Sequence, residues 1–162
     1  MRVLEKKRSV YNANISKKKT CQFCDKKNMA EQICTSLTSH HWFVIASKYP
    51  YMDGNLIIIS KRHVEDIDTL SSEERKEWFE ILECTKQRLG KVFSTTSFNI
   101  SINIGEYSAR SIAHLHWQII PRDRISNQNA LNIFQDIHVI SLDHKDVVRL
   151  IDERNVQVHE HN

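Results

Sequence analysis

The chain has 162 residues, of which 40% are hydrophobic and 27% charged, and its formal net charge at pH 7 is +3. This length suits one domain with a single hydrophobic core, and the composition excludes disordered and fibrous proteins. The charge is too small and too diffuse to indicate a nucleic-acid-binding protein.

Membrane and secretory signals are also missing from the sequence pattern. No run approaches the roughly 18 apolar residues of a membrane span, and the first residues lack the apolar stretch of a secretory signal. We therefore expect a cytoplasmic protein without a membrane partner, in which the four cysteines stay reduced.

The first 60 residues predict an arm, a turn and a hairpin. Residues 1–20 carry little pattern and are expected to form the arm, and the Cys-x-x-Cys of 21–24 follows in a short turn. Segments 42–46 and 56–60 are rich in β-branched and aromatic residues, which is typical of strands. The Tyr-Pro-Tyr-Met-Asp-Gly of 49–54 is a turn sequence, so an antiparallel hairpin is predicted.

A long amphipathic helix is predicted over residues 71–93. Ser71 and Glu74 have the spacing of a capping box, and apolar residues recur at helical spacing as far as Phe93. Cys84 lies within this helix and is expected to be a small buried apolar side chain.

Two further strands and a C-terminal helix complete the predicted fold. Residues 98–104 alternate cleanly, 105–113 form a polar loop, and 114–122 form the last strand of the sheet. Pro121 should end that strand, because proline cannot donate to a ladder. A weak strand at 137–142 and a short helix at 145–154 follow. The predicted class is α+β, with a meander-like antiparallel sheet, one long amphipathic helix and a short C-terminal helix.

The strand at 114–122 carries an unusual polar face. His114, His116 and Gln118 point to one side, and the alternating Leu115, Trp117 and Ile119 point to the other. Two imidazoles and an amide in register favour a reactive site, since histidine serves as nucleophile, proton carrier or metal ligand. The alternative is a polar face with chance histidines, because the chain holds nine.

Cys21 and Cys24 form a single pair, so a metal site needs two further ligands. His63 and His114 are candidates, because zinc takes two thiolates and two imidazoles in tetrahedral geometry. A redox dithiol is a second interpretation, but it expects a βαβ context that this segment lacks. Two unrelated cysteines in a surface turn are the third.

The segment from Asn103 to His114 suits phosphate binding. Asn103 and Ser111 offer amide and hydroxyl groups for phosphoryl oxygens, which leaves a histidine free to attack phosphorus. The alternative is a structural loop in which Gly105 is needed for a positive φ.

Five separate segments occur in the order and spacing of the histidine triad (HIT) superfamily. They are Tyr49-Pro-Tyr-x-x-Gly54, Ser60-Lys-Arg-His63, Asn103-x-Gly105, Ser111 and His114-x-His116-x-Gln118-Ile-Ile-Pro-Arg122. The resemblance covers about residues 21–122. Gln118 stands where the family pattern has a third histidine, and this variant resembles the branch with galactose-1-phosphate uridylyltransferase and the diadenosine tetraphosphate phosphorylases.

The resemblance implies a nucleotidyltransferase or phosphorylase acting on nucleoside polyphosphates of the dinucleoside type. His116 would attack the α-phosphorus and form a nucleotidyl-histidine intermediate, which an acceptor resolves. Gln118 would position the phosphoryl group without carrying a proton, and Asn103 and Ser111 would contact phosphate. Relatives with glutamine tend to transfer to phosphate or sugar phosphate, whereas those with three histidines tend to hydrolyse.

The resemblance also implies a structural zinc ion, a homodimer and a nucleotide substrate, expected to be an adenine nucleotide. The zinc ligands would be Cys21, Cys24, His63 and His114. The implied organisation is an arm at 1–20, a HIT domain with the zinc site at 21–122, and an extension at 123–162 packed on the same domain.

Besides Gln118, three sites depart from the family pattern, one of them a pair of neighbouring residues. Ala109-Arg110 replaces Gly-Gln or Gly-Gly, and Arg110 either holds an acceptor phosphate or points to solvent. Ser47 replaces a ribose-binding asparagine. Asn55 replaces the usual histidine after the hairpin glycine, and the sequence offers no physical account of that change. A nucleotide hydrolase, a nucleotide-binding regulatory protein with little turnover, and a zinc domain that binds a protein partner remain open alternatives.

Overall fold

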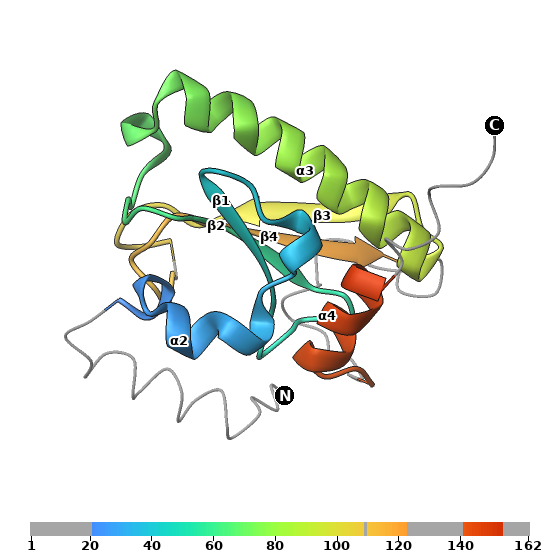
Figure 1. The fold of residues 1–162 in the computed structure, drawn as a ribbon. Coiled ribbons are helices and arrows are strands. Elements are labelled where there is room, and N and C mark those ends of the chain that lie inside the picture. Colours follow the sequence, from blue (N-terminus) through green and yellow to red (C-terminus); the bar gives the residue numbers. More distant parts are fainter. Residues whose placement is uncertain (1–20, 109, 123–140, 154–162) are drawn as a thin grey trace.

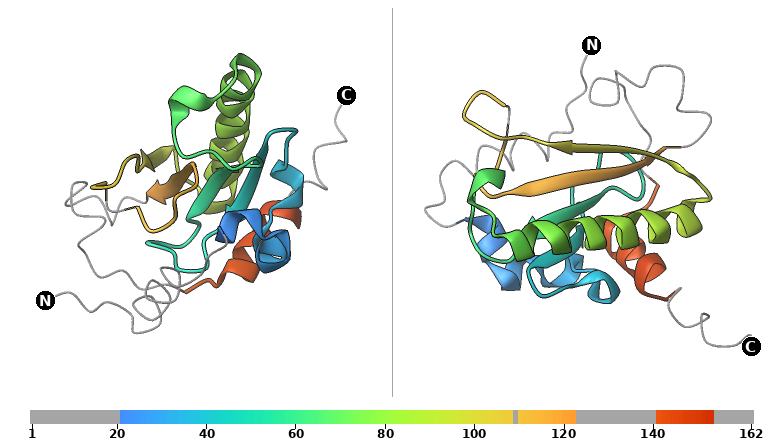
Figure 2. Two further views of the ribbon diagram at one scale, coloured as in Figure 1. Left: turned by 90° about the vertical axis from the view of Figure 1, so that its left-hand side faces the viewer. Right: turned by 90° about the horizontal axis from the view of Figure 1, so that it is seen from above.

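The computed structural model describes residues 21–108, 110–122 and 141–153. Its centre is a four-stranded antiparallel sheet in the order β1-β2-β4-β3, with the long helix α3 running along one face (Figures 1 and 2). The strands are β1 (Trp42–Ala46), β2 (Leu56–Ser60), β3 (Ser97–Ile102) and β4 (His116–Arg122). The α-helices are α2 (Lys26–Met29), α3 (Ser72–Phe93) and α4 (His144–Glu153), and the short 3-10 helices are η1 (Gln22–Cys24), η2 (Ala30–Gln32), η3 (Thr35–Leu37) and η4 (Ile67–Thr69).

The α+β class and the β1–β2 hairpin are confirmed, but the strand order corrects the expected meander. Ala46 pairs with Leu56 at the closed end of the hairpin. The long α3 then carries the chain across the sheet to β3 at the far edge, and β4 returns into the gap. Gln118 of β4 therefore has Ile57 of β2 on one side and Ser101 of β3 on the other.

The last strand begins later and continues further than the sequence predicts. It starts at His116, and it runs through Pro121 to Arg122. Pro121 pairs with Phe98 of β3, whereas the pairing with β2 stops where Leu56 meets Ile119. Pro121 therefore lies beyond the last residue pair between β4 and β2, where no backbone N–H is needed for pairing with β2. The expectation that Pro121 ends the strand is wrong.

Helix α3 begins with the predicted capping box. The Ser71 hydroxyl accepts from the backbone N–H of Glu74 at 3.2 Å, and the Glu74 carboxylate accepts from the backbone N–H of Ser71 at 2.7 Å. Ile81 and Leu89 are buried on the face that packs on the sheet. Cys84 is exposed instead of buried, because it lies beside this stripe and not on it.

Each face of the sheet carries its own hydrophobic cluster. Trp42 and Trp117 pack edge to face under α3, with ring centroids 5.5 Å apart. The opposite face carries the buried side chains Met29, Ile45, Ile57 and Ile59, against which Phe23, Ile33 and Phe43 pack. The segment that contains the cysteine pair thus covers the face away from α3.

The predicted C-terminal helix is confirmed as α4. It packs on β1 and α3, with Val147 and Ile151 buried in the cluster under α3. The Asp152 carboxylate accepts hydrogen bonds from the backbone and hydroxyl groups of Thr35 and Ser36. Residues 141–142 form no strand, and the rest of the weak strand predicted at 137–142, like the arm at 1–20, lies outside the described residues. In the described ranges, no helix is long and apolar enough to cross a membrane.

Candidate active site and metal centre

The alternation of β4 separates the reactive side chains from the core under α3. Trp117 and Ile119 are buried in that core. His116 lies opposite Ile59, and Gln118 lies opposite Ile57, on the other face of the sheet. His116 and Gln118 therefore stand beside the apolar cluster that Phe23, Phe43 and their neighbours complete. An apolar floor beside polar groups is the usual composition of a small-molecule site.

The four predicted metal ligands converge. Their ligand atoms all lie within 4.8 Å of one another, although Cys21 and Cys24 are far from His63 and His114 in the sequence. The Nδ1 atom of His114 is 3.3 Å from the Cys21 sulfur and 3.7 Å from the Cys24 sulfur, and the Nδ1 atom of His63 is 3.4 Å from the Cys24 sulfur. A tetrahedral zinc ion would hold a sulfur and a nitrogen ligand about 3.5 Å apart. The spacing of this donor set fits zinc.

A hydrogen bond on the far side of the His114 ring orients its Nδ1 atom towards the cysteine thiols. Its Nε2 atom lies 2.8 Å from the backbone carbonyl oxygen of Ser60. A carbonyl only accepts, so Nε2 carries the proton and Nδ1 keeps its lone pair for a metal. Burial lowers the pKa of His114, which favours the neutral form that a metal ligand needs.

His116 is oriented by the backbone of its neighbour. Its Nδ1 atom lies 2.6 Å from the carbonyl oxygen of His114, so Nδ1 carries the proton and donates a hydrogen bond, and the lone pair is on Nε2. The Phe23 ring packs edge-on at a centroid distance of 5.2 Å. Burial, with a smaller contribution from the charge of Arg110, lowers the pKa of His116. The imidazole is therefore neutral near pH 7 and suited to nucleophilic attack.

Gln118 is held by a residue whose role the sequence did not explain. The side-chain Nδ2 of Asn55 donates to the Gln118 Oε1 atom at 2.9 Å. Asn55 is 1% exposed and lies directly before β2. The signal in the sequence was the departure from the family's histidine at this position.

The predicted phosphate loop joins β3 to β4. Asn103 follows β3 directly, and the pairing of Ile102 with Trp117 places it next in register to His116. Gly105 has a φ of +88°, as the structural interpretation of this loop requires, and Ser111 is exposed before β4. Residue 109 lies outside the described residues.

Arg110 contacts an acidic side chain in place of extending freely into solvent. Its guanidinium lies 2.8 Å from a carboxylate oxygen of Glu65, and its side chain is only 20% exposed. The other Glu65 oxygen is 3.7 Å from the Nε2 atom of His63, one of the candidate metal ligands. Glu65, which the sequence did not single out, thus connects the predicted phosphate loop to the candidate metal centre.

Ser47 lies on the reactive face, away from His116. It follows β1 and donates its backbone N–H to the carbonyl oxygen of Asn55 at 3.0 Å. Because Ala46 pairs with Leu56 and Phe43 with Ile59, Ser47 is at the Gln118 end of the sheet and the metal centre at the other.

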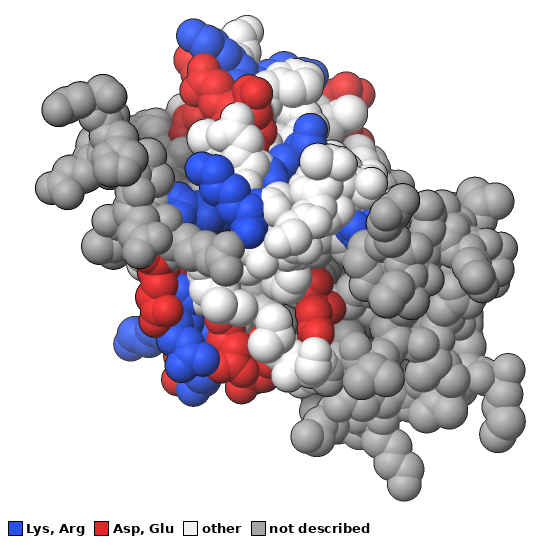
Figure 3. Space-filling view, turned by 90° about the vertical axis from the view of Figure 1, so that its right-hand side faces the viewer, with Lys and Arg blue, Asp and Glu red and all other residues white. Residues whose placement is uncertain are grey.

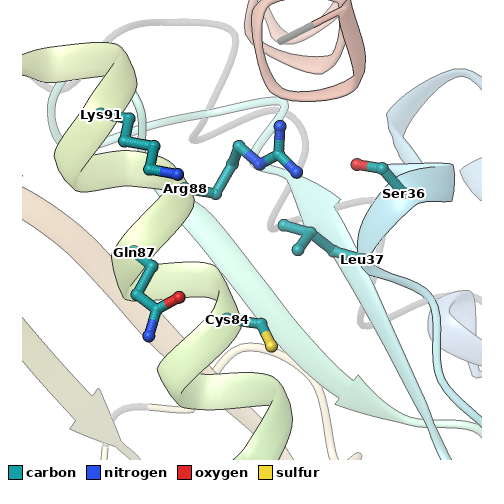
Figure 4. A pocket seen from close by; sticks show the side chains of 6 residues that line it. All are labelled: Ser36, Leu37, Cys84, Gln87, Arg88 and Lys91. Carbon is teal, nitrogen blue, oxygen red and sulfur yellow. The ribbon is translucent and has the colours of Figure 1, made fainter. Parts of the chain in front are cut away.

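A surface pocket lies between α3 and η3, and none of the predicted site residues lines it (Figure 4). Its lining consists of Ser36, Leu37, Cys84, Gln87, Arg88 and Lys91. Figure 3 shows acidic and basic side chains interspersed on one face of the molecule. His116 and Gln118 lie away from this pocket, opposite Ile59 and Ile57 on the sheet face that α3 does not cover.

Comparison with known proteins finds a family model that matches the sheet and part of the candidate site. Residues 30–125 match the HIT domain. Cys21 and Cys24 precede the matched range, whereas His63, Arg110, His116 and Gln118 lie within it.

Two curated relatives act on nucleotides according to their names. The chain is 31% identical over 75 residues to a bis(5'-nucleosyl)-tetraphosphatase (asymmetrical) of Schizosaccharomyces pombe, covering 46% of this chain and 41% of that protein. It is 27% identical over 81 residues to an AP-4-A phosphorylase of Mycobacterium tuberculosis, covering 49% and 42% respectively. The chain spans less than half the length of these relatives.

A solved structure shares the fold over nearly the whole of both chains. It is a zinc-bound histidine triad family protein from Mycobacterium smegmatis, with a TM-score of 0.56 and 18% sequence identity, and the similarity covers 92% of this chain and 94% of that one.

Proposed function

The chain belongs to the HIT domain family, and on that basis we propose that it transfers a nucleotidyl group from a nucleoside polyphosphate by way of His116. The observation that carries the proposal is the orientation of this imidazole. Nδ1–H donates a hydrogen bond to the His114 carbonyl oxygen, with 2.6 Å between nitrogen and oxygen, so the free lone pair is on Nε2. Both curated relatives are named for reactions of nucleotides.

In the first step, the Nε2 atom of His116 attacks the α-phosphorus of the nucleotide. A nitrogen–phosphorus bond forms, and the bond from phosphorus to the bridging oxygen breaks, so the remaining polyphosphate leaves with that electron pair. The proton stays on Nδ1 of His116, which donates a hydrogen bond to the His114 carbonyl oxygen throughout. Gln118, Asn103 and Ser111 are the candidate groups for the phosphoryl oxygens, on which negative charge shifts during the transfer.

In the second step, an acceptor oxygen attacks the same phosphorus and releases His116. We propose inorganic phosphate as the acceptor, which returns a nucleoside diphosphate. Arg110 supports this choice, because a guanidinium near His116 can hold a phosphate bidentately once it leaves Glu65. The Gln118 side chain also has no group that could take a proton from water.

Hydrolysis is the second candidate, because one relative is named a tetraphosphatase. The same covalent intermediate would then be resolved by water. The two candidates differ in the acceptor and not in the nucleophile, so a single assay separates them.

Zinc, where bound, would act as a structural ion held by Cys21, Cys24, His63 and His114. It would connect the segment before α2 to the end of β2 and the start of β4. By fixing His114, it would also fix the carbonyl that orients His116.

We further propose a homodimer. β3 forms an edge of the sheet in the described part of the chain, and Ile100 on it is 41% exposed. An open strand edge with an exposed apolar residue is suited to pairing with a second chain. Light scattering of the purified protein measures the oligomeric state, and a monomer contradicts this part of the proposal.

The decisive experiment mixes the protein with a dinucleoside tetraphosphate labelled at the α-phosphorus, with and without inorganic phosphate. We expect an acid-labile labelled protein, and faster product formation with phosphate present. An equal rate of product formation with and without inorganic phosphate favours the hydrolase. Nucleotide binding without turnover across dinucleoside polyphosphates, phosphoramidates and sugar nucleotides favours a regulatory protein.

A further inference from the structure

Asn55 occupies a buried position between the hairpin turn and β2. It is 1% exposed, so each of its polar atoms needs a partner inside the protein. Its backbone N–H donates to the Met52 carbonyl oxygen at 3.1 Å, and its own carbonyl accepts from Ser47. The backbone of Asn55 is therefore held in the turn, and the side chain extends towards β4.

Three backbone groups determine which way the Asn55 amide faces. The N–H of Tyr51 can only donate, and it lies 3.2 Å from Oδ1. The carbonyl oxygens of Leu56 and Ile119 can only accept, and they lie 3.1 Å and 3.4 Å from Nδ2. If Oδ1 and Nδ2 were exchanged, the amide NH2 group would face the N–H of Tyr51, and the amide oxygen would face the two carbonyl oxygens. None of these pairs could form a hydrogen bond. The amide orientation follows from the backbone.

This orientation is passed on to Gln118. Because Nδ2 of Asn55 is a donor, the atom of Gln118 that faces it at 2.9 Å must be Oε1. The Nε2 group of Gln118 then points away from Asn55, and the described residues include no partner for it. Gln118 is half-buried on the same face as His116.

We propose that Asn55 is a positioning residue that holds Gln118 as a hydrogen-bond donor to the phosphoryl group and turns its oxygen away from the reacting atoms. Held in this way, Gln118 donates to anionic oxygens, but its oxygen is not available to align a water molecule by accepting a hydrogen bond from it. Asn55 thereby favours transfer to phosphate over hydrolysis. This inference rests on the proposed function of His116 and Gln118.

The test compares two ligands that differ only in a phosphate. AMP and adenosine are titrated by calorimetry into the wild type, Asn55→Leu, Gln118→Leu and the double variant. Loss of a hydrogen bond to a charged group costs about 1.5–3 kcal/mol, so we expect AMP affinity to fall about tenfold or more in each single variant. Adenosine affinity should be unchanged.

The double variant separates positioning from independent effects. If Asn55 acts through Gln118, the double variant binds AMP about as weakly as Gln118→Leu alone. Asn55→His supplies another buried donor and should restore AMP affinity to within a few-fold of the wild type. Metal content and thermal melting check that each variant is folded.

Several results would overturn the inference. These are additive losses of AMP affinity, equal losses for AMP and adenosine, and an Asn55→His variant as weak as Asn55→Leu. A wild type that does not bind AMP also contradicts it. A wild type that binds AMP but forms no labelled adduct contradicts the proposed reaction alone, because the binding comparison still decides the role of Asn55.

Discussion

The Nδ1 atom of His116 lies 2.6 Å from the carbonyl oxygen of His114, so a residue of the candidate metal centre also orients the candidate nucleophile. The Phe23 ring, between the two cysteines in sequence, packs on both imidazoles at centroid distances of 5.2 Å and 5.8 Å. The candidate metal centre and the candidate nucleophile are therefore connected twice, once through the backbone and once through an aromatic ring.

Replacing His116, the proposed nucleophile, should prevent formation of the proposed covalent intermediate. We expect His116→Ala to form no labelled adduct and to lose activity about a thousandfold or more, as is usual when a covalent nucleophile is deleted. His41→Ala is the control, because His41 pairs with Glu77 away from the reactive face. An adduct that persists in His116→Ala rules out His116 as the nucleophile.

Zinc should depend on the converging cysteines and not on the others. We expect Cys24→Ser to lower the zinc content of the purified protein and to lower Tm by roughly 10 °C, equivalent to about 3–4 kcal/mol at this chain length. Cys84→Ser is the matched control, since Cys84 is exposed on α3. Elemental analysis and melting curves measure both effects. Equal zinc content in the two variants would show that Cys24 is not a ligand.

Substitutions of Arg110 and Glu65 should change the KM for inorganic phosphate in opposite directions. Arg110→Gln removes the cation and should raise KM for phosphate about tenfold, whereas Glu65→Gln frees Arg110 and should lower that KM. Steady-state rates at varied phosphate concentration measure both. Because Glu65 also lies near His63, zinc content is checked in parallel. Variants that shift KM in the same direction are incompatible with this competition.

Two glycines with positive φ should differ in how much an added methyl group destabilises the protein. A Cβ at Gly54 would lie 2.5 Å from Phe93 and 2.9 Å from Pro121, at a φ of +79°. Crowding and strain together predict a loss of about 2–4 kcal/mol for Gly54→Ala. A Cβ at Gly105 would have no atom within 4 Å, so Gly105→Ala should lower the free energy of unfolding by about 1 kcal/mol, from the φ of +88° alone. Denaturant unfolding measures the difference, and equal losses would contradict it.

Glu74 should make stability depend on pH. Its carboxylate accepts from the Arg62 guanidinium at 2.5 Å and 2.8 Å, and this bonding lowers the Glu74 pKa from 4.5 to about 2. A lowered folded-state pKa gives stabilisation that is fully present above pH 4.5 and is lost as the pH falls towards 2. We expect Glu74→Gln to be less stable than the wild type by about 1–3 kcal/mol at pH 6, and the gap to close in that window. A stability difference between Glu74→Gln and the wild type that does not change with pH would show that it does not arise from ionisation of Glu74.

Local patterns in the sequence predicted the elements well. The Ser71–Glu74 capping box and the alternation of β4 depend on neighbours within a few residues, and both are present. The exposed Cys84 was mispredicted because one position along a helix turns a side chain by about 100°, enough to leave the buried stripe. The strand order was mispredicted because no local signal reports where β4 inserts.

For the site, the sequence by itself determined which side chains stand together on β4 and, through the family's spacing, which four residues were candidate metal ligands. Only the tertiary structure decided how those groups are held. The contact between Asn55 and Gln118 joins residues 63 positions apart, and that between Glu65 and Arg110 joins residues 45 positions apart. Such contacts depend on strand register and loop placement, which are decided by packing the whole chain and not by any one segment.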